Sequence, residues 1–237
     1  MEVNLYNDFN IDSEHGGIIS VCGACGSGKS KLMVDFAIKH SLSGVDCVYF
    51  SEDESASHMR TKFGRALNQR GLTKENLKGR VLLKNSYNMT IKDIFNFIQS
   101  NKCKAVFIDS ITTITLEKII NPQKRFLITE KTIIKKKIER PVTEFERNRQ
   151  LVESLRIISS ENNLNTFISY NANRNIINKS FPTFDRSRSE FLMISDLAFL
   201  ISKEYEENEY DIAGGSVTVE KNRWGADGNG TKFKIEY

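Results

Sequence analysis

The sequence has little of several residue types that would mark it as secreted, membrane-bound or metal-binding. Its 237 residues include three prolines, four cysteines and three histidines, and the cysteines are scattered apart from one C-x-x-C pair. A disulfide framework or a zinc site would need further closely spaced pairs. There is no run of roughly eighteen apolar residues, the length of a membrane-spanning helix, and the first residues lack a basic segment followed by an apolar one. We therefore expect a soluble, cytoplasmic protein with no membrane partner, and we assign no ligand role to its histidines.

What the chain does contain suits one α/β domain. It is 39% hydrophobic and 27% charged, and its length is ample for one packed core and short for two. We predict a single domain over residues 1–237, with an N-terminal arm at 1–15. The net charge is only +4, but residues 124–140 carry seven basic and two acidic side chains, so the whole excess lies there. A basic run is often just a solvated surface, so composition alone leaves its role open.

Residues 23–30, GACGSGKS, have the spacing G-x-x-x-x-G-K-[ST] of a phosphate-binding loop. They follow the apolar run GIISVC and precede KLMVDFAIKHSL, whose apolar residues have helical spacing. This context favours a nucleotide site over an ordinary glycine-rich turn, because the backbone N–H groups of such a loop surround phosphates at a helix N-terminus. Lys29 is expected to contact the β- and γ-phosphates, and Ser30 to hold Mg²⁺. The predicted residues for binding ATP and Mg²⁺ are Gly23, Ala24, Cys25, Gly26, Ser27, Gly28, Lys29 and Ser30.

Strand and helix patterns alternate after this loop. Such alternation predicts a parallel sheet, whose functional residues gather at the C-terminal ends of its strands. Gly23, Asp53 and Asp109 each end or follow an apolar strand, so we expect them to meet at one edge of the sheet. The predicted strands are 46–51, 79–85 and 104–110, and the predicted helices are 55–71 and 90–101.

Two acidic positions in this alternation are candidates for catalysis. Asp109 ends a buried strand, where after a phosphate loop it is expected to orient Mg²⁺ together with Ser30; on its own it would suit an ordinary turn equally well. Glu52, Asp53 and Glu54 follow the neighbouring strand and offer a carboxylate to polarise the attacking water. The same three acids also suit a solvated loop, and the pattern does not distinguish which of them is the base.

Three segments carry a resemblance to a known family. The loop at 23–30, the stretch NRQLVESLRIISSENNLNTFISYNANR at 148–174, with a helix followed by a strand to Asn171, and KNRWG at 221–225 resemble the ATPase core of DnaB-type replicative helicases. RadA-type RecA relatives carry a similar K-N-R-aromatic-G. The segments EFLMISDLAFLISK and VTVEKNRWGADGNGTKFKIEY look like the final strands of the same family. The resemblance implies a RecA-like P-loop NTPase fold of the α/β class, with a mostly parallel twisted sheet and helices on both faces.

The resemblance also implies how the site would work. Members of the family assemble into rings or filaments, hydrolyse ATP between subunits and bind single-stranded DNA, so a homo-oligomer and single-stranded DNA are the implied partners. Asp53 matches the family's catalytic glutamate, and Asn171 replaces the usual glutamine that senses the γ-phosphate. Lys221 and Arg223 match the cations that reach the γ-phosphate held by the neighbouring subunit. From the strand pattern alone, this pair would be exposed cations on an edge strand.

Two segments are predicted to face DNA. The family places such loops after the Asp109 strand and after the Asn171 strand, which here correspond to 124–145 and 172–190. Basic side chains neutralise phosphates, and aromatic side chains such as Phe181 stack on unpaired bases. The predicted DNA-binding residues are Lys131, Lys135, Lys136, Lys137, Arg140, Lys179 and Arg186.

Three functions remain open from the sequence. The first is a DNA motor of the DnaB helicase type, although we expect no separate N-terminal domain of the kind that full-length replicative helicases carry. The second is a recombination or single-strand-annealing ATPase resembling RadA or short phage RecA-like proteins. The third is a regulatory ATPase resembling KaiC, in which ATP controls protein contacts and nucleic acid has no role.

Overall fold

The computed structural model describes residues 11, 16–111, 114, 144–171, 189–205, 212–224 and 232–235. The predicted N-terminal arm lies outside these ranges except for Ile11. Most of the two predicted DNA-facing segments, 124–143 and 172–188, also lies outside them. Within the described part of the chain, no helix is long and apolar enough to cross a membrane.

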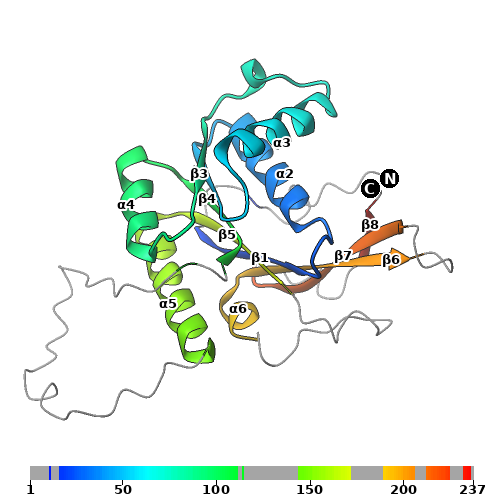
Figure 1. Ribbon diagram of the computed structural model, residues 1–237. Coiled ribbons are helices and arrows are strands. Elements are labelled where there is room, and N and C mark those ends of the chain that lie inside the picture. Colours follow the sequence, from blue (N-terminus) through cyan, green and yellow to red (C-terminus); the bar gives the residue numbers. More distant parts are fainter. Residues whose placement is uncertain are drawn as a thin grey trace, which may run out of the picture.

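Eight strands of the described chain form one sheet in the order β3-β2-β4-β5-β1-β6-β7-β8 (Figure 1). The pairs from β3 to β6 are parallel, whereas β7 is antiparallel to both β6 and β8. The predicted mostly parallel α/β sheet is therefore confirmed. The strands are β1 Gly17–Gly23, β2 Cys47–Ser51, β3 Val81–Asn85, β4 Ala105–Asp109, β5 Asn165–Asn171, β6 Leu197–Tyr205, β7 Ile212–Asn222 and β8 Lys232–Ile235.

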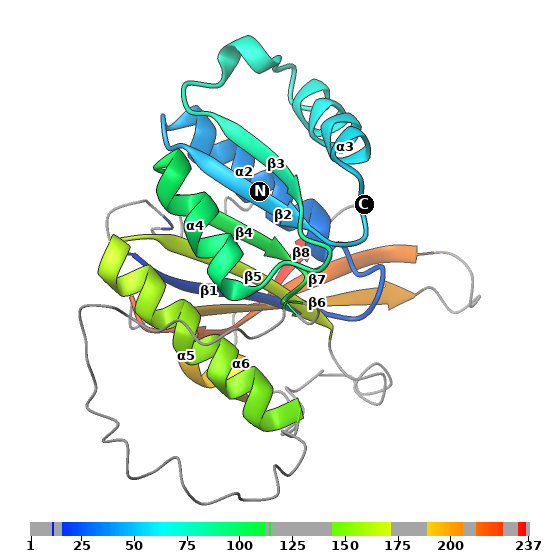
Figure 2. The same ribbon diagram turned by 60° about the vertical axis from the view of Figure 1, so that its left-hand side comes forward.

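Helices cover both faces of this sheet (Figure 1 and Figure 2). Apolar side chains of α2 and α3, such as Phe36 and Phe63, form one buried core with the strands. Those of α4, α5 and α6, such as Ile94, Leu155 and Phe191, form a second core on the opposite face. The helices are α2 Lys29–Leu42, α3 Ala56–Asn68, α4 Ile91–Asn101, α5 Glu144–Asn162 and α6 Ser189–Ile194, with a short 3₁₀ turn η1 at Lys74–Asn76.

The first strand shows why the strands have continuous apolar sequences. Side chains alternate between the two faces of a strand, so Ile19 and Val21 enter the core under α2, while Ile18 and Cys22 enter the core under α5. Every residue of β1 is buried. A strand covered on both faces needs apolar residues at consecutive positions, as parallel sheets generally do.

The segment 190–203 departs from the expectation that it forms a strand. Its first part belongs to α6, and β6 begins only at Leu197. Phe191 enters the core, where its ring stacks on Tyr170 with 4.8 Å between centroids, and the Ser195 hydroxyl donates to the Phe191 carbonyl after the last helical turn. The expectation failed because a short apolar run does not distinguish a brief helix from a strand by its periodicity.

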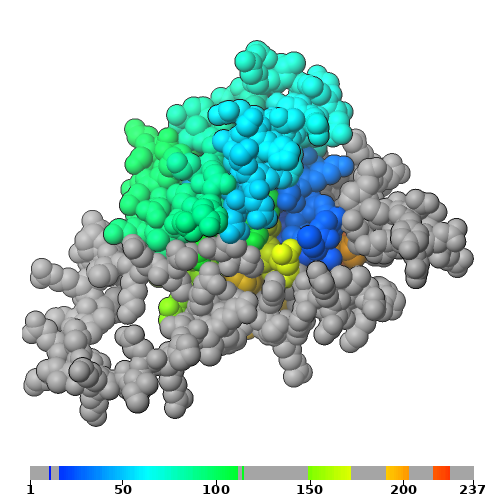
Figure 3. All heavy atoms as spheres, in the orientation of Figure 1, coloured from blue at the N-terminus to red at the C-terminus, as the bar shows by residue number. Residues whose placement is uncertain are grey.

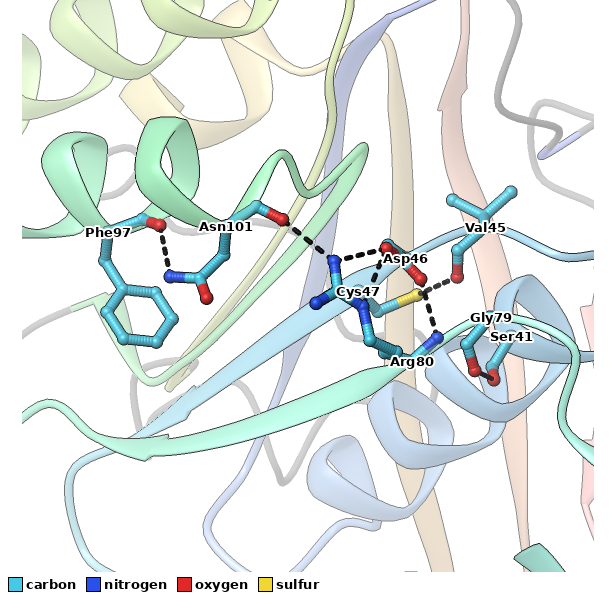
Figure 4. A network of polar contacts seen from close by, with 8 residues as sticks. All are labelled: Ser41, Val45, Asp46, Cys47, Gly79, Arg80, Phe97 and Asn101. Carbon is cyan, nitrogen blue, oxygen red and sulfur yellow. Dashed lines mark hydrogen bonds and ion pairs between the residues drawn. The ribbon is translucent and has the colours of Figure 1, made fainter. Parts of the chain in front are cut away.

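A polar network fastens the ends of β2 and β3 that lie away from Gly23 (Figure 4). The Arg80 guanidinium donates to the Asp46 carboxylate over 2.6 and 2.9 Å and to the Asn101 carbonyl over 3.1 Å, so it joins both strands to the end of α4. These hydrogen bonds lower the pKa of Asp46. The network holds β2 and β3 in register with each other. This register determines where the opposite ends of the two strands present their side chains.

Candidate nucleotide-binding site

The predicted phosphate loop joins β1 to α2, as its sequence context requires. Gly26 and Gly28 have positive φ values of 71° and 93°, which favour glycine. A Cβ at Gly23 would lie 2.6 Å from the Ile201 carbonyl oxygen and against the Ser27 hydroxyl, so only glycine fits there. The first turn of α2 contains no acidic residue. The N–H groups at this helix start therefore suit an external anion such as phosphate.

Lys29 lies inside this loop. Its ammonium donates to the carbonyl oxygens of Gly23 over 3.0 Å and of Ala24 over 2.7 Å, and the residue is only 8% exposed. Burial lowers the pKa of Lys29, while the nearby Asp109 carboxylate acts in the opposite direction. Among the described residues the hydrogen-bond partners of Lys29 are two neutral carbonyl oxygens, so its positive charge is well suited to an incoming anionic phosphate.

Asp109 ends β4 at the same edge of the sheet. It lies opposite Ser51 of β2 in the register, and its carboxylate accepts hydrogen bonds from Tyr49 and Ser169. Among the described residues, no group of three or more His, Cys, Asp or Glu side chains could hold a metal by itself. An ion here would thus depend on the Ser30 hydroxyl, Asp109 and phosphate oxygens, which is the oxygen-rich shell that Mg²⁺ prefers.

Asn171 is the last residue of β5 and lies directly opposite Gly23 in the parallel pair of β5 with β1. The space-filling view shows atoms from the segment after β1, in blue, beside atoms near the end of β5, in yellow (Figure 3). The strand order therefore brings the predicted γ-phosphate sensor to the phosphate loop. Gly23 and Asn171 are far apart in the sequence and lie side by side in the sheet. This agrees with the expectation that functional residues gather at the C-terminal ends of the strands.

The acidic turn after β2 is held by a residue that the sequence did not single out. Asn85, at the end of β3, donates from its amide to the backbone carbonyls of Glu52 and Glu54, each over 3.1 Å. Glu54 forms an ion pair with Lys62. In the described part of the chain, the exposed Asp53 carboxylate makes no hydrogen bond or ion pair. The sequence did offer one signal for Asn85, because it is an amide side chain at the end of the strand that comes next after the acidic turn.

We expect Asp53→Asn to lower the rate of hydrolysis while nucleotide affinity stays nearly unchanged. The reason is that a carboxylate that accepts the proton of water contributes to turnover and not to phosphate binding. Single-turnover rates and nucleotide titrations would measure the two effects separately. Glu54→Gln is the matched control, because the Glu54 carboxylate is already paired with Lys62. If Glu54→Gln lost turnover and Asp53→Asn did not, the base would be Glu54.

Lys221 lies near the end of β7, and Arg223 follows the last residue of that strand. β8 pairs with β7 only over Gly215–Thr218, so within the described chain Lys221 pairs with β6 alone. Lys221 donates to the carbonyls of Leu192 and Met193 over 2.8 and 2.6 Å, and Arg223 donates to Met193 over 3.1 Å. Burial, followed by the charge of Arg223, lowers the pKa of Lys221 to about 8. Both cations thus lie at the C-terminal end of α6, where helix carbonyls attract positive charge.

This pair lies at the opposite end of β1 from the phosphate loop of the same chain. A Cβ at Gly17 would be 2.7 Å from the Trp224 ring and 2.9 Å from the Asp196 carboxylate, which itself pairs with Arg223 at 3.5 Å. Gly17 and Gly23 are the two ends of β1, so about 20 Å separates them at the usual rise of a strand. Arg223 is consequently too far away to serve its own phosphate loop.

The predicted DNA-binding side chains all lie outside the described residues: Lys131, Lys135, Lys136, Lys137, Arg140, Lys179 and Arg186. The described chain does show that the segments carrying them follow β4 and β5. They therefore start from the same sheet edge as Asp109 and Asn171.

No family model and no curated protein matches the sequence. The structure, however, is similar to solved ones. A KaiC-like protein, PH0186, from the hyperthermophilic archaeon Pyrococcus horikoshii OT3 superposes with a TM-score of 0.60 at 16% identity, over 94% of this chain and 86% of that one. A second solved structure, an ATPase domain, gives a TM-score of 0.63 at 11% identity, over 93% of this chain and 81% of that one.

The chain has a RecA-like fold. Both similar structures cover nearly its whole length, and one of them is an ATPase domain. The resemblance predicted from the phosphate loop and the KNRWG segment is thereby confirmed at the level of the fold. At 16% and 11% identity the likeness concerns the fold, so a more specific function depends on the residues of the site.

Proposed function

We propose that this chain is an ATP-hydrolysing motor of the DnaB helicase type, which acts as a homo-oligomer on single-stranded DNA in replication or recombination. The loop at 23–30 binds the phosphates of ATP, and Ser30 and Asp109 hold Mg²⁺. When bound, Mg²⁺ supplies positive charge to the phosphoryl group that is transferred. Lys29 neutralises the phosphates from inside the loop, and Asp53 accepts a proton from the attacking water.

The observation that most supports this proposal is the convergence of polar residues at one sheet edge. Lys29 lies inside the loop within the electrostatic influence of Asp109, and Asn171 lies opposite Gly23. They come from three separate parts of the sequence, and the ends of parallel strands are where α/β proteins bind ligands.

The far position of Arg223 supports action between subunits. Because Arg223 lies near the end of β1 that is about 20 Å from the phosphate loop, it can serve a phosphate only on a neighbouring copy. Repetition of such a head-to-tail contact generates a ring or a filament. In that arrangement the guanidinium stabilises the charge that develops during transfer.

Two other functions have specific support. The KNRWG segment, which resembles that of RadA-type proteins, supports a recombination or single-strand-annealing ATPase. The likeness to a KaiC-like protein supports a regulatory ATPase in which hydrolysis changes protein contacts. All three share the site described above, so they differ in what the hydrolysis drives.

For a DNA motor, we expect single-stranded DNA to increase the ATPase rate of the purified protein, because DNA would bind loops that start at the catalytic sheet edge. Steady-state ATPase rates with and without an oligonucleotide, beside the mass in solution, measure this. An unchanged rate would favour the regulatory function. A forked duplex then separates the two DNA functions, since only a helicase unwinds it.

Neutralising Lys135, Lys136 and Lys137 together should weaken the same DNA interaction. Each lost phosphate contact should reduce the log–log salt slope of binding by roughly 0.7. Replacement of three exposed lysines elsewhere, Lys74, Lys78 and Lys102, with glutamine is the matched control for net charge. Equal slopes in both triple variants would make the basic segment a solvated surface.

A further inference from the structure

Both oxygens of the Asp109 carboxylate accept a hydroxyl hydrogen bond. The Tyr49 hydroxyl donates to Oδ2 over 2.7 Å, and the Ser169 hydroxyl donates to Oδ1 over 2.5 Å. The donors belong to β2 and β5, the two strands that flank β4. The carboxylate is therefore fixed from both sides by the sheet itself.

Tyr49 can act only as a donor to this carboxylate. It is 2% exposed, and its ring packs at 5.4 Å from the ring of Phe63 and at 6.0 Å from that of Phe107. A phenol of ordinary acidity keeps its proton at neutral pH, so the Tyr49 hydroxyl is the donor and the Asp109 carboxylate the acceptor of this hydrogen bond.

The aromatic packing does not by itself require this hydroxyl. Phenylalanine would make the same ring contacts with Phe63 and Phe107, and alanine would suit the fully buried position of Ser169. Each carboxylate oxygen can accept a second hydrogen bond or a metal after it has accepted one hydroxyl. The two donors thus restrict the rotation of Asp109 and leave its other lone pairs free for a ligand near Lys29.

We propose that Tyr49 and Ser169 are positioning residues that hold the Asp109 carboxylate in the orientation needed to bind Mg²⁺ with the nucleotide. The proposal rests on the proposed nucleotide site and assigns two further residues to it. Neither residue touches the nucleotide; each acts through Asp109. Loss of either hydroxyl should raise the concentration of Mg²⁺ required and leave the contacts of the phosphate loop intact.

The test is a Mg²⁺ titration of nucleotide binding with a fluorescent ATP analogue. We expect Tyr49→Phe and Ser169→Ala each to raise the half-saturating Mg²⁺ concentration by about tenfold, the effect of one hydrogen bond to a charged group. Affinity for the analogue in excess EDTA should equal that of the unchanged protein, because Lys29 and the loop are untouched. An unchanged Mg²⁺ requirement in both variants would overturn the proposal.

A double-mutant cycle separates positioning from general damage to the sheet. In an Asp109→Ala background, Tyr49→Phe should have no further effect on the Mg²⁺ titration, since there is no carboxylate left to orient. An equal loss in both backgrounds would overturn the proposal. Tyr170→Phe is the matched control, because it removes another buried tyrosine hydroxyl, from the opposite core, and should leave the Mg²⁺ requirement unchanged.

The unchanged protein distinguishes this inference from the proposed function. If it binds the analogue with Mg²⁺ and the two variants behave identically to it, only the positioning role fails. If it does not bind the analogue at all, the nucleotide site and the positioning role fail together. Ser169→Ala removes a single oxygen, so it keeps the test valid should Tyr49→Phe fold poorly.

Discussion

Lys29→Ala is expected to abolish nucleotide hydrolysis. The ammonium of Lys29 is the cation of the phosphate loop, and it is buried against two loop carbonyls, so its loss leaves the phosphate charge without a partner inside the cradle. Asp109→Ala should remove Mg²⁺-dependent turnover, because the carboxylate is the acidic group held at the same edge. Phosphate release by each purified variant, at saturating ATP and Mg²⁺, measures both effects.

Lys31→Ala is the matched control for Lys29→Ala. Lys31 is exposed and lies on the same helix, so the variant loses the same charge and similar side-chain length without touching the loop. We expect its rate to stay close to that of the unchanged protein. If Lys29→Ala and Asp109→Ala both retained that rate as well, residues 23–30 would not be the catalytic phosphate loop.

The main features of the fold could be predicted because each rests on a local pattern. The strand β1 and the helix α2 follow from the change between consecutive apolar residues and helical spacing, and the loop between them follows from its glycines. The alternation of such units then predicts a parallel sheet. The brief helix α6 was missed because its few residues do not establish a period.

The partners of Asp109 could not be predicted in the same way. Tyr49 and Ser169 are each sixty residues from Asp109 in the sequence, and they meet it only because β2 and β5 flank β4 in a particular register. Asn85 reaches the acidic turn for the same reason. A serine or tyrosine in an apolar strand has no sequence signature that identifies its partner across the sheet.

Lys221 and Arg223 illustrate both what the sequence could predict and what it could not. Both donate to the Met193 carbonyl, so they share a side as the sequence predicts, although Arg223 lies one residue past the end of β7. The structure adds a second role, since the pair caps α6, and Arg223 also joins Asp196 at 3.5 Å. A local role in capping and a role toward the neighbouring subunit therefore have to be separated by experiment.

Mixing two inactive variants separates the capping role of Arg223 from its role toward the neighbouring subunit. Arg223→Ala protein should be inactive alone, because a finger of this kind contributes roughly 10³ to 10⁵ to the rate. We expect activity to return when it is mixed with Lys29→Ala protein. An interface can then pair an intact phosphate loop from one subunit with an intact Arg223 from the other, and random mixing in equal amounts gives about one such interface in four.

The controls decide between the two roles. Arg223→Ala protein should retain its thermal unfolding midpoint and its oligomeric mass, since the Lys221 contacts to α6 remain, whereas a lower midpoint with no recovery on mixing would make Arg223 a local cap. Lys29→Ala mixed with Asp109→Ala is the matched negative control. Both of its defects lie on the phosphate-loop side of an interface, so no pairing of those subunits restores a complete site. Recovery with Arg223→Ala but not with Asp109→Ala would place Arg223, unlike Asp109, across the interface from the nucleotide it serves.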